Sequence, residues 1–596
     1  MKTIFTIFTA LLTTCFLNLS AQTIYVDASN NTGVEDGTEQ HPFNTIKEGI
    51  ASSTAGTTVM IKAGTYYPDE TWTEYNNVLH LKPGVKLKGE SQSNTMIEGI
   101  VVDTNQSNLA IGLEGLYFHE FRFSRGFTEG PFDASNIVSN CRANLLGAYC
   151  AGGIPLNDTT PGPIYGFLFE NNDLGMEGEI NFSMGSGDAQ ISAINNTCGW
   201  IKIQSGGGYH YLIDNNEVQF GIADKSGACY TTISNNMIIN GGITDKSGAY
   251  GYPVEDQFIQ YNTITCNENS PFLEEEFEIS AMSLSCGSVT VKDNIINCTG
   301  KVSGIMASSG APFHVINNTI TVDEVLVPVE DEDEAIYAIR TMSGWGHITG
   351  NKLTGGQVGY YSSAGSDSFS GNEIKRAYYG FYSVGAEEVK YNLIEDCHST
   401  GMILNGLRGP IHHNTIRNNA GHGIWVLRPQ IDLGGGEDNC PGANVIQGNA
   451  DYDLYIETQN TDTVYLSAKY NVWDHSDPTE IALYDIRDAN DSTGLATIVD
   501  FMPIGYLAIQ ENSFGARFMV YPNPTNGKFE ARMPGIGIIG ARFEIFDLHG
   551  RKLFEKTIPA GNETIEIDVN HLGNGVYLCR LISKNTSATQ KLIIQK

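Results

Sequence analysis

A short motif repeats along most of this chain: an apolar residue, two variable residues, an asparagine, one variable residue and a second apolar residue. In its clearest copies the asparagines stand 20, 20 and 26 residues apart. The copies lie at Asn172, Asn196, Asn216, Asn236, Asn262, Asn294, Asn318, Asn351, Asn372, Asn392 and Asn414, with looser copies at Asn449 and Asn471. A fixed period of this kind is typical of a repeat architecture.

The length of the period indicates which architecture to expect. About 20 to 24 residues are too few for paired helices or a propeller blade, but they suit three short strands and three turns. Strands of neighbouring coils lie ~4.8 Å apart, so each asparagine amide can bond the amides above and below it. We place the asparagine at a bend, because this residue tolerates left-handed backbone. The sequence therefore predicts an all-β fold, a right-handed parallel β-helix.

Composition limits the partners and the cell compartment. The chain has 596 residues and a net charge of −33, which disfavours nucleic acid as a partner. Lys2, a following apolar run and Ala21 predict a signal peptide over residues 1–21, and no later segment is expected to span a membrane. We therefore expect a protein that is secreted or held at the outer cell surface.

Cysteines and acidic insertions offer weak evidence for bridges or metal. The cysteines form no CxxC pair, and Cys198 falls at an inward position, so Cys141 and Cys150 are the one pair to test for a disulfide. Acidic insertions at residues 274–278 and 330–334 lengthen two coils. They are either calcium sites or solvated loops, and the lack of an Asp-x-Asp-x-Gly pattern favours loops. The cofactor stays unknown, with calcium as the candidate.

A second repeat predicts an aromatic row. A glycine followed by two large apolar residues recurs every 21 to 22 residues between positions 359 and 425. If the first apolar residue of each pair faces the core, Tyr361, Tyr382 and Trp425 stand outside in a row. Such a row would either stack on sugar rings or lie partly buried under a loop.

Two copies of Asp-Lys-Ser-Gly-Ala, one coil apart, place Lys225 and Lys246 on the same face. The arrangement resembles in kind the site of uronate lyases on this fold, in which a Lys or Arg takes the proton beside a carboxylate, often with calcium. The resemblance implies that Lys225 and Lys246 are catalytic. The alternative is an ordinary surface ladder of paired Asp and Lys.

Basic residues cluster within one or two coils of the aromatic row. These residues are Arg408, His412, His413, His422 and Arg428. They could bind an acidic sugar or act as general acid and base. If His412 and His413 lie on a strand, they point to opposite faces, so at most one of them faces the ligand. His422 lies between two glycines, which coincides with a short polygalacturonase motif, but the paired carboxylates that a glycosidase needs are missing. A lyase is therefore favoured over a hydrolase if the protein is an enzyme.

Both ends of the chain resemble known families. Residues 24–27, 41–46 and 56–66 run strand, Gly turn, Pro-Phe-x-Thr-Ile and strand, which resembles the opening of secreted pectate-lyase-like β-helices and the domain of unknown function at their N-termini. The resemblance implies that residues 43–51 form a helix that caps the first coil. Such a cap covers an otherwise unpaired sheet edge.

The last eighty residues combine a Tyr-Pro-Asn-Pro start at 521–524 with strands and Gly/Asn turns at 545–551, 572–578 and 591–596. The alternation predicts a small antiparallel β-sandwich. The ordered set resembles the C-terminal sorting domain of the type IX secretion system of Bacteroidetes over 516–596. That resemblance implies export across the outer membrane, with the type IX machinery as a partner.

These features predict a signal peptide at 1–21, a β-helix at 22–503, a linker at 504–515 and a sorting domain at 516–596. The β-helix is expected to bind an extracellular polysaccharide. The residues leave open whether the protein also cleaves that polymer as a lyase, and the competing hypothesis is a non-catalytic surface adhesin or scaffold.

Overall fold

The computed structural model describes residues 22–596 with gaps at 69–76, 104–108, 126–134, 151–164, 187–189, 208–209, 226–229, 247–256, 277–278, 286–287, 309–311, 332, 344–345, 364–366, 387, 407–408, 437–439, 458–462, 492–494, 506–518, 533–540, 548–550, 559–563 and 584–585. The predicted signal peptide and most of the predicted linker lie outside the described residues. The chain divides into two compact units, Met1–Gly505 and Tyr506–Lys596. The helices that the structure describes are all too short or too polar to traverse a bilayer.

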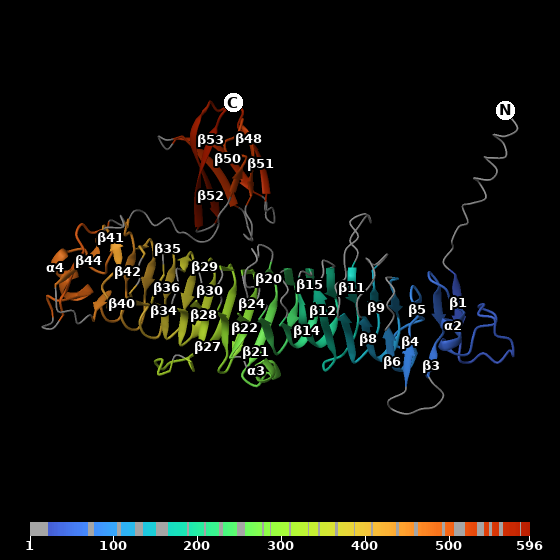
Figure 1. Cartoon of the computed structure of the whole chain (residues 1–596). Coiled ribbons are helices and arrows are strands. Elements are labelled where there is room, and N and C mark those ends of the chain that lie inside the picture. Colours follow the sequence, from blue (N-terminus) through green and yellow to red (C-terminus); the bar gives the residue numbers. More distant parts are fainter. Residues whose placement is uncertain are drawn as a thin grey trace. The chain divides into compact units, whose positions relative to one another are not determined.

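The first unit is the predicted parallel β-helix, whose stacked coils run from β1 to β46 (Figure 1). One row of strands forms a 16-stranded parallel sheet. Its members in spatial order are β1 (Thr23–Val26), β2 (Thr58–Ile61), β5 (Lys86–Gly89), β7 (Gly112–Glu114), β9 (Ile137–Ser139), β11 (Tyr165–Glu170), β13 (Gln190–Ile194), β15 (His210–Asp214), β17 (Tyr230–Ser234), β20 (Phe258–Gln260), β23 (Val289–Lys292), β26 (Phe313–Ile316), β29 (Gly346–Thr349), β32 (Ser368–Ser370), β35 (Glu388–Lys390) and β38 (Ile411–His412).

The other strands of the coils pair into a second parallel sheet. Early coils supply one long or two short strands each, namely β3 (Gly64–Tyr66), β4 (Val78–His80), β6 (Thr95–Asp103), β8 (Tyr117–Arg125), β10 (Leu145–Cys150), β12 (Glu179–Ser186), β14 (Thr197–Gly207) and β16 (Glu217–Asp224). From residue 237 the strand splits, and the middle row holds β18 (Met237–Ile238), β21 (Thr263–Asn267), β24 (Ile295–Thr299), β27 (Thr319–Glu324), β30 (Lys352–Gly356), β33 (Glu373–Lys375), β36 (Leu393–Glu395), β39 (Thr415–Arg417) and β42 (Val445–Gln447). The third row holds β19 (Gly242–Asp245), β22 (Ser280–Leu284), β25 (Ser303–Ser308), β28 (Tyr337–Ser343), β31 (Val358–Ser362), β34 (Tyr379–Ser383), β37 (Met402–Asn405), β40 (Ile424–Arg428), β43 (Leu454–Ile456) and β45 (Ile486–Arg487).

The predicted asparagine ladder is confirmed. In each step the Nδ2 and backbone N–H of one asparagine donate to the Oδ1 of the next, as from Asn216 to Asn236 at 2.9 Å each. The ladder runs unbroken through Asn172, Asn196, Asn216, Asn236, Asn262, Asn294, Asn318, Asn351, Asn372, Asn392, Asn414, Asn444 and Asn471. These buried amides are thus satisfied by one another and by backbone carbonyls.

Two details of the prediction were wrong. The left-handed bend falls on the residue before the ladder, such as Asn215 with φ of 54°, while the ladder asparagine itself points into the core. Asn449 does not belong to the ladder; its Oδ1 instead accepts from Asn419 in a separate short stack. Asn444, which the sequence motif did not identify, lies in the ladder between Asn414 and Asn471.

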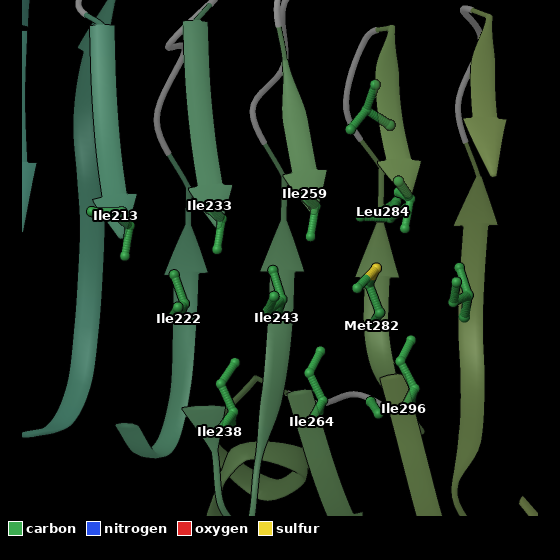
Figure 2. Packing of buried hydrophobic residues seen from close by; sticks show 14 of the residues in the cluster. Ile213, Ile222, Ile233, Ile238, Ile243, Ile259, Ile264, Met282, Leu284 and Ile296 are labelled. Carbon is green, nitrogen blue, oxygen red and sulfur yellow. The ribbon is translucent and has the colours of Figure 1, made fainter. Parts of the chain in front are cut away.

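Three columns of aliphatic side chains fill the interior, one column for each strand of a coil. Figure 2 shows them side by side over successive coils. They are Ile213, Ile233 and Ile259, then Ile222, Ile243 and Met282, then Ile238, Ile264 and Ile296. Because parallel pairing in register places like residues above one another, the repeat in the sequence becomes a continuous core.

A capped helix covers the first coil, as predicted. Helix α2 (Ile46–Ser52) begins at Thr45, whose side chain and that of Glu48 form a reciprocal capping box. Its buried face includes Gly49, where a Cβ atom would lie 2.7 Å from Val26. The helix can therefore pack directly against β1.

The last coils use a third small parallel sheet, β41 (Asp432–Gly434), β44 (Val464–Ala468) and β46 (Thr497–Asp500). The short helix α4 (Pro478–Glu480) continues into the π-helical turn η1 (Ile481–Asp485), which leads into β45.

The second unit has its own core and two antiparallel sheets, as predicted for a β-sandwich. One sheet holds β47 (Met519–Tyr521), β48 (Lys528–Arg532) and β51 (Thr564–Asp568), and the other holds β50 (Lys552–Ile558), β49 (Ala541–Phe546), β52 (Gly575–Ser583) and β53 (Thr586–Ile594).

Cys141 is a free thiol in the core, so it forms no bridge to Cys150. Burial raises the pKa of Cys141 to about 12. Cys198 is likewise buried, as its inward position predicts. Both act as small apolar residues.

Candidate functional site

One column of side chains on the outer side of the third row collects most of the aromatic residues that the sequence singled out. We call it the aromatic–arginine ladder. Strand pairing aligns Arg340, Tyr361, Tyr382, Ile403, Trp425, Tyr455 and Arg487 in seven successive strands. Their chain neighbours point into the main core, as Tyr360 and Phe381 do. Alternation along each strand therefore turns the ladder outward.

The first part of the ladder lies under a loop. Tyr361 is 4% exposed and packs with Tyr337 and with Val329 and Ala335 of the second acidic insertion. The guanidinium carbon of Arg340 stands 5.1 Å from the Tyr337 ring centroid and 5.7 Å from that of Tyr361. For Tyr361 the buried alternative is thus correct.

The middle of the ladder is a stacked tyrosine pair followed by an aliphatic residue. The rings of Tyr361 and Tyr382 stack on each other with centroids 5.2 Å apart and planes at 26°. Tyr361 therefore covers one face of the Tyr382 ring, which is half-buried. Ile403, the next residue, is buried.

The last part of the ladder forms an aromatic cluster that is half-buried. We call His422, Trp425, Tyr452 and Tyr455 the C-terminal aromatic cluster. The His422 ring stacks on Tyr455 at 4.1 Å, and Trp425 meets Tyr455 edge to face at 6.2 Å. Arg487 places its guanidinium carbon 4.8 Å from the Tyr455 centroid. Half-buried aromatic rings beside a cation are suited to contacting sugar rings.

Charged groups surround this cluster. Burial lowers the pKa of His422, and the nearby Asp451 carboxylate, 3.8 Å away, opposes that shift only in part. His422 is therefore neutral near pH 7 and can donate or accept a hydrogen bond. Arg428 is exposed at the end of β40. Arg408 lies outside the described residues.

Sequence reasoning missed Arg340, Tyr455 and Arg487 as members of the ladder. The glycine that precedes each earlier pair is replaced by Asp453 before Tyr455, and the coil is lengthened to 30 residues there. The sequence signal that could have identified Tyr455 as a member of the ladder was its aromatic side chain two residues after Asp453, at the end of the lengthened coil.

Lys225 and Lys246 lie on the same face, as expected, but both contact one glutamate. The Lys225 Nζ forms an ion pair with Oε1 of Glu276 at 2.9 Å, and the Lys246 Nζ donates to the Glu276 backbone carbonyl at 3.2 Å. Lys202, one coil earlier, pairs with Glu179 at 2.9 Å and with Glu275 at 2.7 Å. We call Lys202, Lys225 and Lys246 the lysine row.

Two of the three glutamates that contact the lysine row, Glu275 and Glu276, come from helix α3 (Pro271–Glu276), which begins the first acidic insertion, and the third, Glu179, lies on β12. Phe272 fixes this helix, because a Cβ atom on Gly221 or Gly242 would lie within 2.6 Å of its ring. Lysines engage the carboxylates of Glu275 and Glu276, and among the described residues of this insertion no three acidic groups converge as a calcium site requires. In the second insertion Asp333 pairs with Arg340 at 3.2 Å.

A different set of residues could hold a metal ion. Asp453, Asp474 and Asp485 bring carboxylate oxygens within 4.8 Å of one another, and the first and last are buried. Burial raises the pKa of Asp453 to about 8, and the two neighbouring carboxylates add to the shift. Asn449 and His475 already donate hydrogen bonds to the buried pair. The set suits a hard cation such as Ca²⁺ but is also satisfied by the protein alone.

His412 and His413 do not both lie on a strand, so the condition for their pointing to opposite faces is not met. Their Nδ1 atoms lie 2.8 Å from each other. His412 ends β38, whereas His413 has φ of 56° and occupies the left-handed bend, so strand alternation stops there.

Models of two known families match parts of the chain, one in each unit. Residues 519–595 match the model of the secretion system C-terminal sorting domain. Residues 29–113 and 287–480 match the model of a protein of unknown function, DUF1565. No protein with a curated description shows significant similarity to the chain.

Two solved structures resemble the chain at low sequence identity. The PL6 family alginate lyase AlyGC shares 10% identity, with 81% of this chain and 100% of that chain covered and a TM-score of 0.16. The A-module of the Azotobacter vinelandii mannuronan C-5 epimerase AlgE6 shares 12% identity over 76% and 93% of the two chains, with a TM-score of 0.11. Likeness at this level says nothing about activity or substrate.

Proposed function

We propose that this protein, a parallel β-helix that its C-terminal sorting domain directs through the type IX secretion system to the cell surface or the medium, binds an extracellular polysaccharide. The observation that carries the proposal is the aromatic–arginine ladder, which stays in register over seven strands. Six steps of strand spacing make the ladder roughly 29 Å long. Its half-buried members, Tyr382, Trp425, Tyr455 and Arg487, fall within the last four of these steps, roughly 19 Å, which matches a few consecutive rings of a linear polymer.

The C-terminal aromatic cluster is the main contact in this proposal. Trp425 and Tyr455 supply apolar surface for the C–H faces of sugar rings. Arg428, Arg487 and Asp451 supply donors and acceptors for hydroxyl or carboxyl groups around it. Tyr382 and the covered Tyr361 extend the face as a rigid support.

The arrangement of the lysine row bears on whether the polymer is also cleaved. A lyase needs a base that is free to take a proton beside a neutralised carboxylate. Lys225 is held by Glu276, so it must exchange that partner for substrate before it can act. This observation favours the second candidate function, a non-catalytic surface adhesin or scaffold, over a lyase in the state described.

A glycan panel tests both functions. We expect binding to at least one of alginate, pectate, glycosaminoglycans and neutral glycans, measured by affinity electrophoresis of the full chain. Absorbance of unsaturated uronate that grows with time and disappears in Lys225→Ala or Lys246→Ala would establish the lyase. Binding without product would establish the adhesin, and no binding to any member would contradict the proposal.

A further inference from the structure

The strand β38 and the bend after it bring two imidazoles together on the outer side of the 16-stranded sheet. His412 is buried and His413 is exposed. The left-handed backbone at His413 turns its side chain back toward His412, so the two Nδ1 atoms face each other at 2.8 Å. The same bend exists in most coils, with Asn195, Asn215 and Asn235 in the equivalent position. The bend is therefore a feature of the fold, and the paired imidazoles are specific to this coil.

A carboxylate holds one ring nitrogen of the buried histidine. Nε2 of His412 lies 3.2 Å from Oε1 of Glu388, one coil earlier on the same sheet. The carboxylate accepts the Nε2–H, which leaves the lone pair of His412 on Nδ1. Lys390 pairs with the other oxygen of Glu388 and holds the carboxylate in place. A carboxylate behind an imidazole in this way is the usual support of a metal-binding histidine.

The exposed histidine turns the same ring nitrogen toward this lone pair, because its Nδ1 faces that of His412. The Tyr391 ring lies against His413 with centroids 4.9 Å apart and limits its rotation. In the next coil Ala443 occupies the equivalent bend, and its methyl group leaves the outer side of His413 open.

We propose that His412 and His413 chelate a divalent transition-metal ion, Zn²⁺, Cu²⁺ or Ni²⁺, through their Nδ1 atoms. Two nitrogens each about 2.0–2.1 Å from one metal at neighbouring coordination positions are separated by roughly 3 Å, close to the observed distance. Imidazole nitrogen suits these ions, whereas Ca²⁺ and Mg²⁺ prefer oxygen. Solvent completes the coordination on the open side. The other arrangement that this geometry allows is a direct hydrogen bond between the two Nδ1 atoms without a metal.

Metal titration of the full chain separates the two arrangements. The protein is freed of metal with EDTA, and ZnCl₂ and CuCl₂ are titrated by calorimetry while the Cu²⁺ spectrum is recorded by electron paramagnetic resonance. We expect a strongest site with one ion per chain and two nitrogen ligands. His413→Asn keeps the left-handed bend, because asparagine occupies it in other coils, and we expect it to weaken that site at least tenfold without lowering Tm. His412→Ala is expected to do the same.

Two further variants make the assignment specific. Glu388→Gln removes the carboxylate behind His412 together with its ion pair to Lys390 and keeps both histidines. Loss of such a partner typically costs roughly 10- to 100-fold in metal affinity. His347→Ala is the matched control: His347 stacks on His314 at 5.0 Å on the same sheet, away from the proposed pair, so its loss should leave the strongest site unchanged. Equal affinity in the wild type and His413→Asn, or no metal bound by the wild type, would overturn the proposal and leave the direct hydrogen bond.

Discussion

At the scale of single residues, the fold depends on asparagine amides that are buried but fully paired. The Asn236 side chain donates to the Ile213 carbonyl and to Oδ1 of Asn262, and its own Oδ1 accepts two bonds from Asn216. Replacing it leaves buried donors and acceptors without partners in two coils. Leaving a buried donor or acceptor without its hydrogen bond lowers the free energy of unfolding by more than the intact hydrogen bond adds to it.

We predict that Asn236→Ala lowers the free energy of unfolding by on the order of 3 kcal/mol, since each unpaired buried group costs about 1–3 kcal/mol. Urea unfolding followed by circular dichroism measures it. Asn235→Gly is the control, because glycine adopts the left-handed bend of that exposed residue at low cost. Equal losses in both variants would argue against the ladder as the source of stability.

A second residue-scale prediction concerns Asp453, whose pKa is raised to about 8, mainly by burial. Between the ordinary pKa near 4 and about 8, the folded protein binds more protons at this site than the unfolded chain does. Stability should therefore fall as pH rises through that window and level off above it. In EDTA, Tm of the wild type is expected to drop from pH 5 to pH 8 more than Tm of Asp453→Asn. Parallel curves for the two proteins would contradict the assignment.

Residue patterns predicted the ladder but not its details. Asn444 escaped detection because Pro441 stands where the motif requires an inward apolar residue, whereas Asn449 has Ile446 at that place and matched by chance. The pairing of His412 with His413 depends on a single left-handed φ, and histidine is not among the residues that most often signal such a bend. A backbone dihedral of this kind has no reliable sequence marker.

At the scale of elements, the acidic insertions show what spacing alone can and cannot predict. The stretched interval from Asn262 to Asn294 marked an insertion correctly. It did not indicate that α3 folds onto the outer side of the sheet, because that depends on the slot formed by Gly221 and Gly242 for Phe272. The lysines and the glutamates that pair with them are distant in sequence. The ion pairs between them could therefore not be predicted from the position of either group.

We predict that Glu276→Gln increases affinity for a polyanion. The change removes the negative partner of Lys225 and leaves the backbone carbonyl contact of Lys246 in place. Retention on a heparin column should shift to higher salt, because more lysine charge is then available to the polymer. Glu274→Gln, on the same helix and exposed, makes no ion pair among the described residues and serves as the control. An identical shift in both variants would mean that net charge alone is responsible.

At the scale of the whole molecule, the two units are built to be separable in function. Each has its own buried cluster of apolar residues, and the family model for sorting covers residues 519–595 alone. The sorting domain carries several short motifs in a fixed order, so its presence and its β-sandwich fold could be predicted from the sequence. The boundaries proposed for the linker and the signal peptide stay predictions.

Deleting residues 516–596 is therefore expected to abolish export while leaving the β-helix folded. The truncated protein should be retained inside the cell, as measured by fractionation and immunoblotting against the full chain. Its Tm should match that of the β-helix transition in the full chain, because the ladder and its core lie within the first unit. Normal export of the truncated protein would contradict the role of the sorting domain.

The central claim is that the outer aromatic–arginine ladder is the face that binds polysaccharide. The most direct test is calorimetric titration of the polymer identified by the panel into Trp425→Ala/Tyr455→Ala and into Tyr465→Ala, which removes a ring that is 70% exposed on β44, outside the ladder. The account predicts at least a tenfold loss of affinity, about 1.4 kcal/mol, in the ladder variant and no change in the control. Unchanged affinity in the ladder variant would contradict it.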